Sequence, residues 1–186
     1  MNIRDNIIET TVVLFNRKGF DFKMDDLAKE LHISKKTIYK YFSTKEDIFR
    51  VFILESFQSV HDKQLEIFSN PSLSVQQKLI QILNTRSKYE DQLSIEKTLA
   101  LKEYYPSLYE LIMSTYQTQW ENVDSLLTQG KKENIFYSNI SNQVIIAMLI
   151  ESMQMMHRDN LLQKTGLSYR DAISQAIEIV LNGITK

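Results

Sequence analysis

Residues that break helices are scarce in this chain, and this restricts the folds open to it more than any other feature. Only four glycines and two prolines occur in 186 residues, so little interrupts a helix once it has formed. There is no long alternation of apolar and polar residues, and no Asn-Gly or Asp-Gly hairpin signal lies between such alternations. The sequence therefore predicts an all-α fold.

Apolar residues recur at helical spacing along almost the whole chain and predict about nine helices. Ser34 is a good N-cap for the third helix, and Thr44 or Ser43 can cap the fourth. Asn70-Pro71 ends the fourth helix, and Tyr105-Pro106 ends the sixth. The expected helices cover roughly residues 3–18, 24–31, 35–41, 44–69, 74–90, 94–104, 108–130, 140–158 and 168–184.

The composition excludes several classes of protein. There is no cysteine, hence no disulfide and no thiolate metal site. Asp5 and Glu9 interrupt the N-terminal apolar residues, which is not the pattern of a signal peptide. The longest apolar run, 144–150, is far too short to span a membrane. No phosphate loop, HExxH or GxSxG motif occurs. We therefore expect a cytoplasmic protein that is not an enzyme and carries no metal or cofactor.

Positive charge is concentrated in one short segment, although the net charge of the chain is −1. Residues 1–50 hold ten Lys or Arg against eight Asp or Glu, and residues 35–50 hold five against two. A cation excess this small and local indicates that a short segment contacts nucleic acid. It does not indicate a protein that coats DNA along its whole surface.

The same segment contains a helix-turn-helix pattern between Leu27 and Tyr41. Two short helices are separated by a three-residue turn, His32-Ile33-Ser34, in which Ile33 can plug the turn. Leu27, Leu31 and Ile38 supply apolar contacts between the helices. In such a motif the second helix enters the major groove of DNA.

The second helix of this motif has an outward face suited to DNA. Lys36, Tyr39 and Lys40 share that face, and Lys35 and Thr37 stand at its N-terminal end. Lysines can neutralise phosphates or donate to guanine, and tyrosine hydroxyls can donate to phosphate oxygens. The simpler alternative is that these lysines only form a solvated surface. Here, however, they lie on the helix that the turn motif independently predicts to contact DNA bases.

The segment "KGFDFKMDDLAKELHISKKTIYKYFSTKEDIF" resembles the DNA-binding domain of the TetR family of bacterial transcriptional regulators. The resemblance implies an all-helical homodimer, most often a repressor of a palindromic operator that a small molecule releases. It implies a helix-turn-helix DNA-binding domain over residues 1–47 and an effector-binding and dimerisation domain over 48–186. The family's DNA contacts fall here on Lys36, Thr37, Tyr39, Lys40, Tyr41 and Lys45, and Ser34 matches its turn serine.

Three positions depart from the family pattern. His32 stands where the turn usually has glycine, and histidine tolerates a positive φ better than most residues. Lys23 replaces the usual Thr or Ser at the start of the second helix, which loses the cap but offers a cation to phosphate. Lys36 replaces a glycine and adds a possible contact.

Aromatic and methionine residues predict an adaptable pocket for an apolar or aromatic effector. The candidate ligand-binding residues are Tyr89, Tyr109, Met113, Tyr116, Trp120 and Met148. The two last helices could also form half of a four-helix dimer interface. Its candidates are Val144, Met148, Met155, Tyr169, Ala172, Ile173, Ala176, Ile177 and Val180. Packing within the core of a single chain is the alternative for both patterns, and for the aromatic and methionine residues it is the more common one.

Two other functions stay open at this point. The Lys/Tyr helix could contact a protein partner instead of DNA. The chain could also bind DNA without an effector, as a constitutive repressor, an activator or a regulator controlled by another protein.

Overall fold

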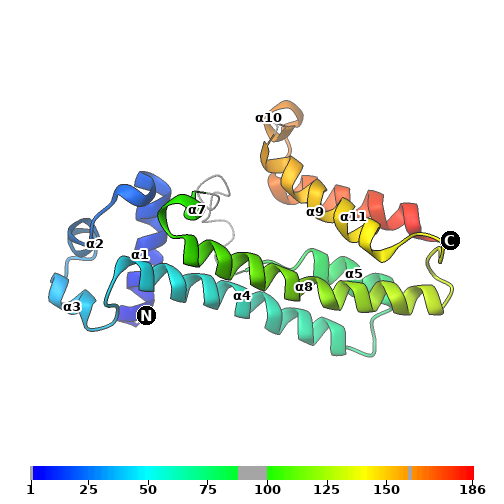
Figure 1. Ribbon diagram of the computed structural model, residues 1–186, viewed down its shortest axis with the longest axis horizontal. Coiled ribbons are helices and arrows are strands. Elements are labelled where there is room, and N and C mark those ends of the chain that lie inside the picture. The colour runs from blue at the N-terminus through cyan, green and yellow to red at the C-terminus, as the bar shows by residue number, and fades with distance from the viewer. Residues whose placement is uncertain (1, 88–99, 159–160) are drawn as a thin grey trace. The chain divides into compact units, whose positions relative to one another are not determined.

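The computed structural model describes residues 2–87, 100–158 and 161–186. In these residues the regular secondary structure is helical, with one isolated bridge between Phe136 and Thr185. The all-α fold class is confirmed (Figure 1). The elements are α1 (Ile3–Lys18), the 3-10 helix η1 (Gly19–Asp21), α2 (Met24–Glu30), α3 (Lys35–Tyr39), α4 (Lys45–Ser69), α5 (Val75–Leu83), α7 (Leu101–Tyr104), α8 (Pro106–Lys132), α9 (Asn142–Arg158), α10 (Leu161–Thr165) and α11 (Tyr169–Ile184).

The number of helices is close to the expected nine, but α5 ends earlier than predicted. It stops at Leu83 instead of continuing toward residue 90. The side chains of Asn84 and Thr85 bond back to the carbonyls of Ile80 and Gln81, at 2.8 and 2.9 Å, and so satisfy the end of the helix. Residues 88–99, on which parts of the fifth and sixth predicted helices fall, lie outside the described residues.

Side-chain caps begin several of the helices, including those predicted at Ser34 and Thr44. The Ser34 hydroxyl accepts a hydrogen bond from the Thr37 N–H at 3.1 Å. Thr44 and Asp47 bond reciprocally to each other's backbone N–H, at 2.9 and 3.0 Å. These bonds fix the first residue of α3 and of α4, since they satisfy N–H groups that have no partner inside the helix.

The chain forms two compact units. Unit 1 contains the described residues of Met1–Ser59 and Ser87–Thr115, and unit 2 contains Val60–Arg86 and Tyr116–Lys186. This is a division by packing. The division by role after residue 47 stays a prediction.

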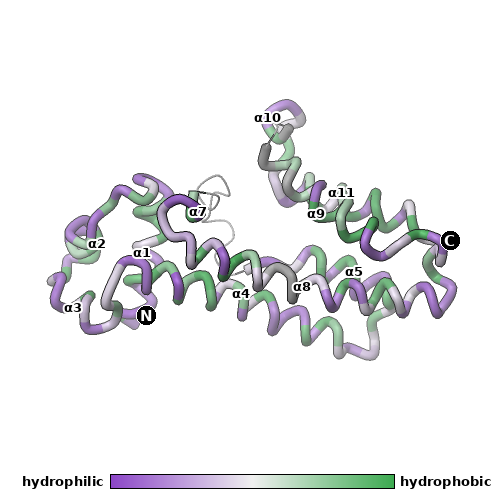
Figure 2. The backbone as a smooth tube through the Cα atoms, viewed as in Figure 1, coloured by the Kyte–Doolittle hydropathy of each residue, from purple (hydrophilic) through white to green (hydrophobic). Residues whose placement is uncertain are grey.

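Unit 1 is built around fully buried apolar side chains from α1, α2, α3 and α4. Ile7, Leu27, Ile38 and Ile48 each have 0% of their surface exposed. Figure 2 shows hydrophobic and hydrophilic residues alternating along α4, as expected for a helix with one apolar face.

Unit 2 packs α11 against α9 and α5 (Figure 1). The apolar stripe of α11 faces this core, where Ile173 and Ile177 are 0% and 2% exposed. Backbone bonds tie the last residues to the segment after α8: Tyr137 donates to Ile184, and Lys186 donates to Ile135. The C-terminal helix is therefore held by its apolar face and by its end.

Gly130 of α8 permits a close approach between the helix and a buried ring. A Cβ built at this position would lie 2.2 Å from a ring carbon of Phe136, whose own exposure is 0%. A ring this deeply buried has little room to move aside.

We predict that Gly130→Ala destabilises the protein, although alanine favours helices. The overlap costs about 1–3 kcal/mol, more than the roughly 1 kcal/mol that the better helix propensity supplies. Urea unfolding should give a lower free energy of unfolding. Ser125→Ala, on the exposed side of the same helix, is the control and should change it by less than about 0.5 kcal/mol. Equal stabilities for the two variants would contradict the prediction.

Candidate nucleic-acid interface

The link between α2 and α3 is a regular helix-ending turn. The Ile33 N–H donates to the Ala28 carbonyl at 3.0 Å, and the His32 N–H donates to the Lys29 carbonyl at 3.2 Å. This pair of bonds is the Schellman motif, which requires a left-handed residue just after the helix. His32 is that residue, with φ of 54°. Ile33 packs against the core of unit 1, as expected for the plug of the turn.

The residues of α3 divide into a buried anchor and an exposed face. Ile38 is completely buried, whereas Lys36 and Lys40 are exposed and Tyr39 and Tyr41 are 49% and 45% exposed. The helix ends at Tyr39, earlier than the predicted residue 41, and its last turn continues through a Phe42 N–H bond to Ile38. Buried Phe42 thus fixes the chain that carries Lys40 and Tyr41.

Three of the predicted contact residues already have polar partners at the start of α3. The Ser34 and Thr37 hydroxyls lie 2.9 Å apart within the cap. The Lys35 ammonium forms an ion pair with Asp25 of α2 at 2.8 Å, and this hydrogen bond raises the pKa of Lys35. Lys36 and Lys40 have no ion pair with any residue in the part of the chain that the structure describes.

Lys23 stands at the N-cap of α2 and makes no capping bond with its side chain. This agrees with the loss of a cap expected from the sequence. The Asp26 carboxylate compensates by accepting the Lys23 backbone N–H at 2.8 Å. That bond, together with the Lys18 ammonium 2.9 Å from Asp26, holds the pKa of this carboxyl below its usual value.

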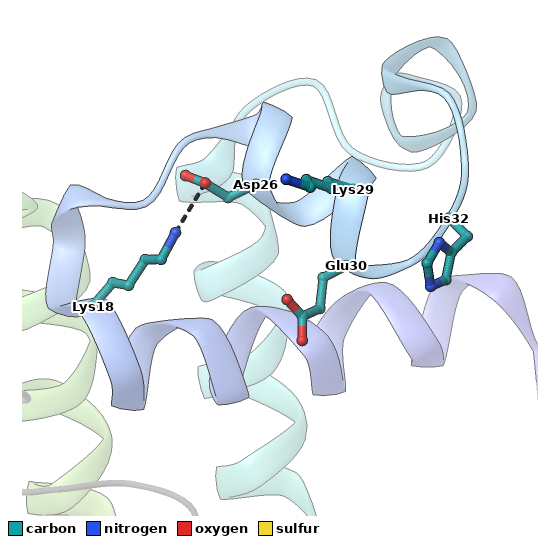
Figure 3. Close-up of a pocket in the computed structure, with 5 residues that line it drawn as sticks. All are labelled: Lys18, Asp26, Lys29, Glu30 and His32. Atoms are coloured by element: carbon teal, nitrogen blue, oxygen red, sulfur yellow. Dashed lines mark hydrogen bonds and ion pairs between the residues drawn. The ribbon is translucent and has the colours of Figure 1, made fainter.

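Figure 3 shows a hollow of unit 1 next to this cap. It is lined by residues of α1, α2 and the turn, namely Lys18, Asp26, Lys29, Glu30 and His32. Both signs of charge meet there, and both carboxylates have cationic partners, Lys18 for Asp26 and Arg17 for Glu30. This pairing fastens α2 to α1 and leaves no surplus of one charge to attract an ion.

Lys45 does not extend into solvent as a free phosphate-binding cation. Its ammonium donates to the backbone carbonyls of Phe20 and Phe22, at 2.6 and 2.9 Å. It also lies 4.5 Å from the centre of the Phe22 ring. Burial lowers the pKa of this ammonium, while the Asp21 carboxylate acts in the opposite direction. The expectation that Lys45 contacts DNA stays a prediction, although its ammonium already has two backbone partners in unit 1.

The predicted effector residues do not form one described group. Tyr109 packs against the core of unit 1, and Trp120 packs against the core of unit 2. Met113 and Met148 are 40% and 55% exposed. Tyr89 lies outside the described residues, and so does the side chain of Tyr116.

The predicted dimer interface divides according to burial. Four of its α11 residues, Ala172, Ile173, Ile177 and Val180, are at most 8% exposed and contribute to the core of unit 2. Tyr169 and Ala176 are partly buried against the same core. The sequence pattern could not separate an intrachain face from an interchain one. The three remaining residues of the predicted interface are exposed apolar side chains of α9, namely Val144, Met148 and Met155. On α11, Ile179 is 73% exposed.

Other kinds of site find no support in the described ranges. No group of three or more His, Cys, Asp or Glu could hold a metal ion there. None of the described helices is long and apolar enough to cross a membrane.

Comparison with known proteins identifies the helix-turn-helix unit. The family model described as "Bacterial regulatory proteins, tetR family" matches residues 7–51. The HTH-type transcriptional regulator YvaF of Bacillus subtilis is 26% identical over 96% of this chain and 94% of the relative. The helix-turn-helix segment of this chain, residues 7–51, is similar to the DNA-binding domain of the TetR family. The chain is a helix-turn-helix, DNA-binding transcriptional regulator.

Two further proteins are similar to this chain. The negative transcriptional regulator IcaR of the biofilm operon icaADBC in Staphylococcus epidermidis is 34% identical over 30% of each chain. A transcriptional regulator from Saccharomonospora viridis, solved in complex with choline, has the same fold. Its TM-score is 0.80 at 19% identity, and the match covers 99% of this chain and 98% of that one.

We predict that His32→Gly stabilises the protein. A non-glycine residue in the left-handed region costs about 1 kcal/mol, of which the flexibility of glycine in the unfolded chain returns part. Urea unfolding should show a gain of about 0.5 kcal/mol. His32→Ala is the matched control, because it removes the imidazole but keeps the positive φ, and it should give no gain. A glycine variant no more stable than the alanine variant would refute the explanation.

Proposed function

We propose that the chain acts in the cytoplasm, without catalytic activity, as a homodimeric repressor. Two copies of α3 would read a palindromic operator about one helical turn of DNA apart. The observation that carries the proposal is the division of α3 into a buried anchor, Ile38, and an exposed face with Lys36, Tyr39 and Lys40. A helix seated in this way presents its polar face without having to rearrange.

The residues of this face would have different roles. Lys36 and Lys40 are cations without ion-pair partners among the described residues, and they can neutralise phosphates or donate to guanine. The half-exposed hydroxyls of Tyr39 and Tyr41 can donate to phosphate oxygens.

Lys23 adds a cation at the start of α2, while Lys35 can reach phosphate only by leaving Asp25. Ser34 and Thr37 would act mainly through the cap of α3.

The homodimer is supported by the apolar surface of unit 2. Val144, Met148 and Met155 recur at i, i+4 and i+11 and therefore lie on one side of α9. All three are more than 40% exposed, and α11 adds Ile179. Exposed apolar residues gathered in this way are typical of a protein–protein contact. A second copy of the same surface would cover them by two-fold symmetry.

Two of the similar proteins and one buried side chain support repression and release by an effector. The shared helix-turn-helix of the negative regulator IcaR favours repression, and the choline complex of the S. viridis protein favours a small-molecule effector. Within unit 2, buried Gln64 leaves its carbonyl oxygen without a hydrogen-bond donor, as a polar ligand group could require. A thermal-shift screen with apolar, aromatic and quaternary ammonium compounds tests the effector.

The proposal is tested by selecting bound sequences from random double-stranded DNA with the purified protein at near-physiological salt. Enrichment of a palindrome supports a dimeric reader and provides the operator. Enrichment of a single half-site would contradict the dimer. If nothing is enriched by a folded protein, the reading face of α3 is wrongly assigned.

We predict that Lys36→Met and Lys40→Met weaken operator binding and flatten its salt dependence. Each lost phosphate contact should reduce the slope of log K against log salt by about 0.9. Fluorescence anisotropy titrations at several salt concentrations measure this slope. Lys132→Met, an equal loss of charge at an exposed position of α8, is the control and should leave the slope unchanged. Slopes equal to the wild-type value in both α3 variants would contradict the assignment.

We also predict that Met148→Glu dissociates the dimer, because a carboxylate would be buried against an apolar face. Sedimentation equilibrium should give a dissociation constant at least tenfold higher. Ile80→Glu introduces the same charge at a 47% exposed isoleucine of α5 and should leave the assembly intact. If both variants remain dimeric, the interface lies elsewhere.

A further inference from the structure

Lys45 is the first residue of α4, yet its charge is directed into unit 1. The two carbonyls that it binds belong to consecutive parts of the link between α1 and α2. Phe20 lies in η1, and Phe22 immediately precedes Lys23, the N-cap of α2. One ammonium therefore fastens the start of α4 to the segment that sets where α2 begins.

Apolar contacts hold the same link on the same helix. The rings of Phe20 and Phe22 lie 5.6 and 6.2 Å from the ring of Phe49, one turn further along α4. Phe20 and Phe22 are 8% and 1% exposed, so their carbonyls have little access to water. Without Lys45 these acceptors would lose their charged donor, which is costly for a buried group.

The hydrogen bonds of Lys45 are connected through α2 to the exposed face of α3. α2 runs from its N-cap at Lys23 to the Schellman turn at His32, and α3 follows at once from its cap at Ser34. These few residues, together with the ion pairs of α2 to α1 and the buried Leu27 and Ile38, set the directions of both short helices. A shift at Phe22 would therefore be carried to Lys36, Tyr39 and Lys40.

We propose that Lys45 is a positioning residue for DNA recognition, which orients α2 and α3 through the carbonyls of Phe20 and Phe22 and makes no phosphate contact. The proposal rests on the proposed function, since the effect is read through operator binding. It reverses the role that the family resemblance implies for this lysine. The half-buried position and lowered pKa of the ammonium agree with an internal role.

Salt dependence separates the two roles. Lys45→Met keeps the length of the side chain and its contact with the Phe22 ring but removes both hydrogen bonds. We expect operator affinity to fall at least tenfold while the slope of log K against log salt stays at the wild-type value. Lys40→Met is the matched variant and should lower the slope by about 1.8, because each subunit of the homodimer loses one phosphate contact.

Two outcomes in the folded Lys45→Met variant would overturn the proposal. A slope reduced by about 1.8, as in Lys40→Met, would mean one phosphate contact from each subunit. An unchanged affinity, with the fold confirmed by circular dichroism, would mean that Lys45 serves stability alone. Loss of binding by Lys45→Met with a wild-type slope supports positioning.

Lysine labelling of the wild-type protein tests the same point without a substitution. Acetylation followed by mass spectrometry should label Lys45 slowly with and without operator DNA, whereas Lys36 and Lys40 should be protected only by DNA. A lowered pKa alone would speed the labelling of Lys45, so slow labelling reports its hydrogen-bonded position. Fast labelling of Lys45 that DNA suppresses would overturn the proposal. If DNA protects neither Lys36 nor Lys40, it is the proposed function that fails.

Discussion

The ring of Phe49 is the contact on which unit 1 depends. Its centre lies 5.3 Å from that of Phe15, 5.6 Å from Phe20, 6.2 Å from Phe22 and 6.0 Å from Tyr105. These partners come from α1, η1, the link between η1 and α2, and the junction of α7 with α8. Aromatic pairs of this kind contribute about 0.5–1.5 kcal/mol each beyond burial. By contrast, α2 and α3 have seven and five residues, too few to be stable helices alone. Helix α3 is therefore stable because it packs against a core that α1 and α4 form.

Much of the fold could be predicted from the sequence because local chemistry decides it. Ser34 and Thr44 cap their helices as expected, since a hydroxyl before a helical stripe satisfies the first N–H groups. His32 adopts the positive φ expected at its place in the turn. The end of α5 was harder to predict, because Asn84 and Thr85 stop it through side-chain bonds that leave no trace in the apolar pattern. Helical spacing also predicted the stripe on α11, but not that the stripe faces its own chain.

The charges of the site were the least predictable part. Counting lysines assumes that every ammonium group is available to bind phosphate. In the structure the Lys45 ammonium binds a backbone carbonyl of unit 1, and Lys35 is paired with Asp25. Both partners come from elements that are distant in sequence or lie across a turn, so spacing along α3 could not reveal them. Residues 20 and 22 carry no polar side chain, and it is their backbone carbonyls that hold Lys45. Because every residue has a backbone carbonyl, the sequence does not indicate which carbonyls accept hydrogen bonds from Lys45.

The ion pair between Asp25 and Lys35 has a consequence for how the protein would search a chromosome. Attraction to random DNA depends on the number of phosphates that cations can neutralise, not on base contacts. With Lys35 held by Asp25, each copy of α3 offers fewer unpaired cations than its composition suggests. Its residence on random sequence would then be short, and frequent detachment would let one molecule sample distant stretches of the genome. A carboxylate on the neighbouring helix would thus weaken attachment to random sequence.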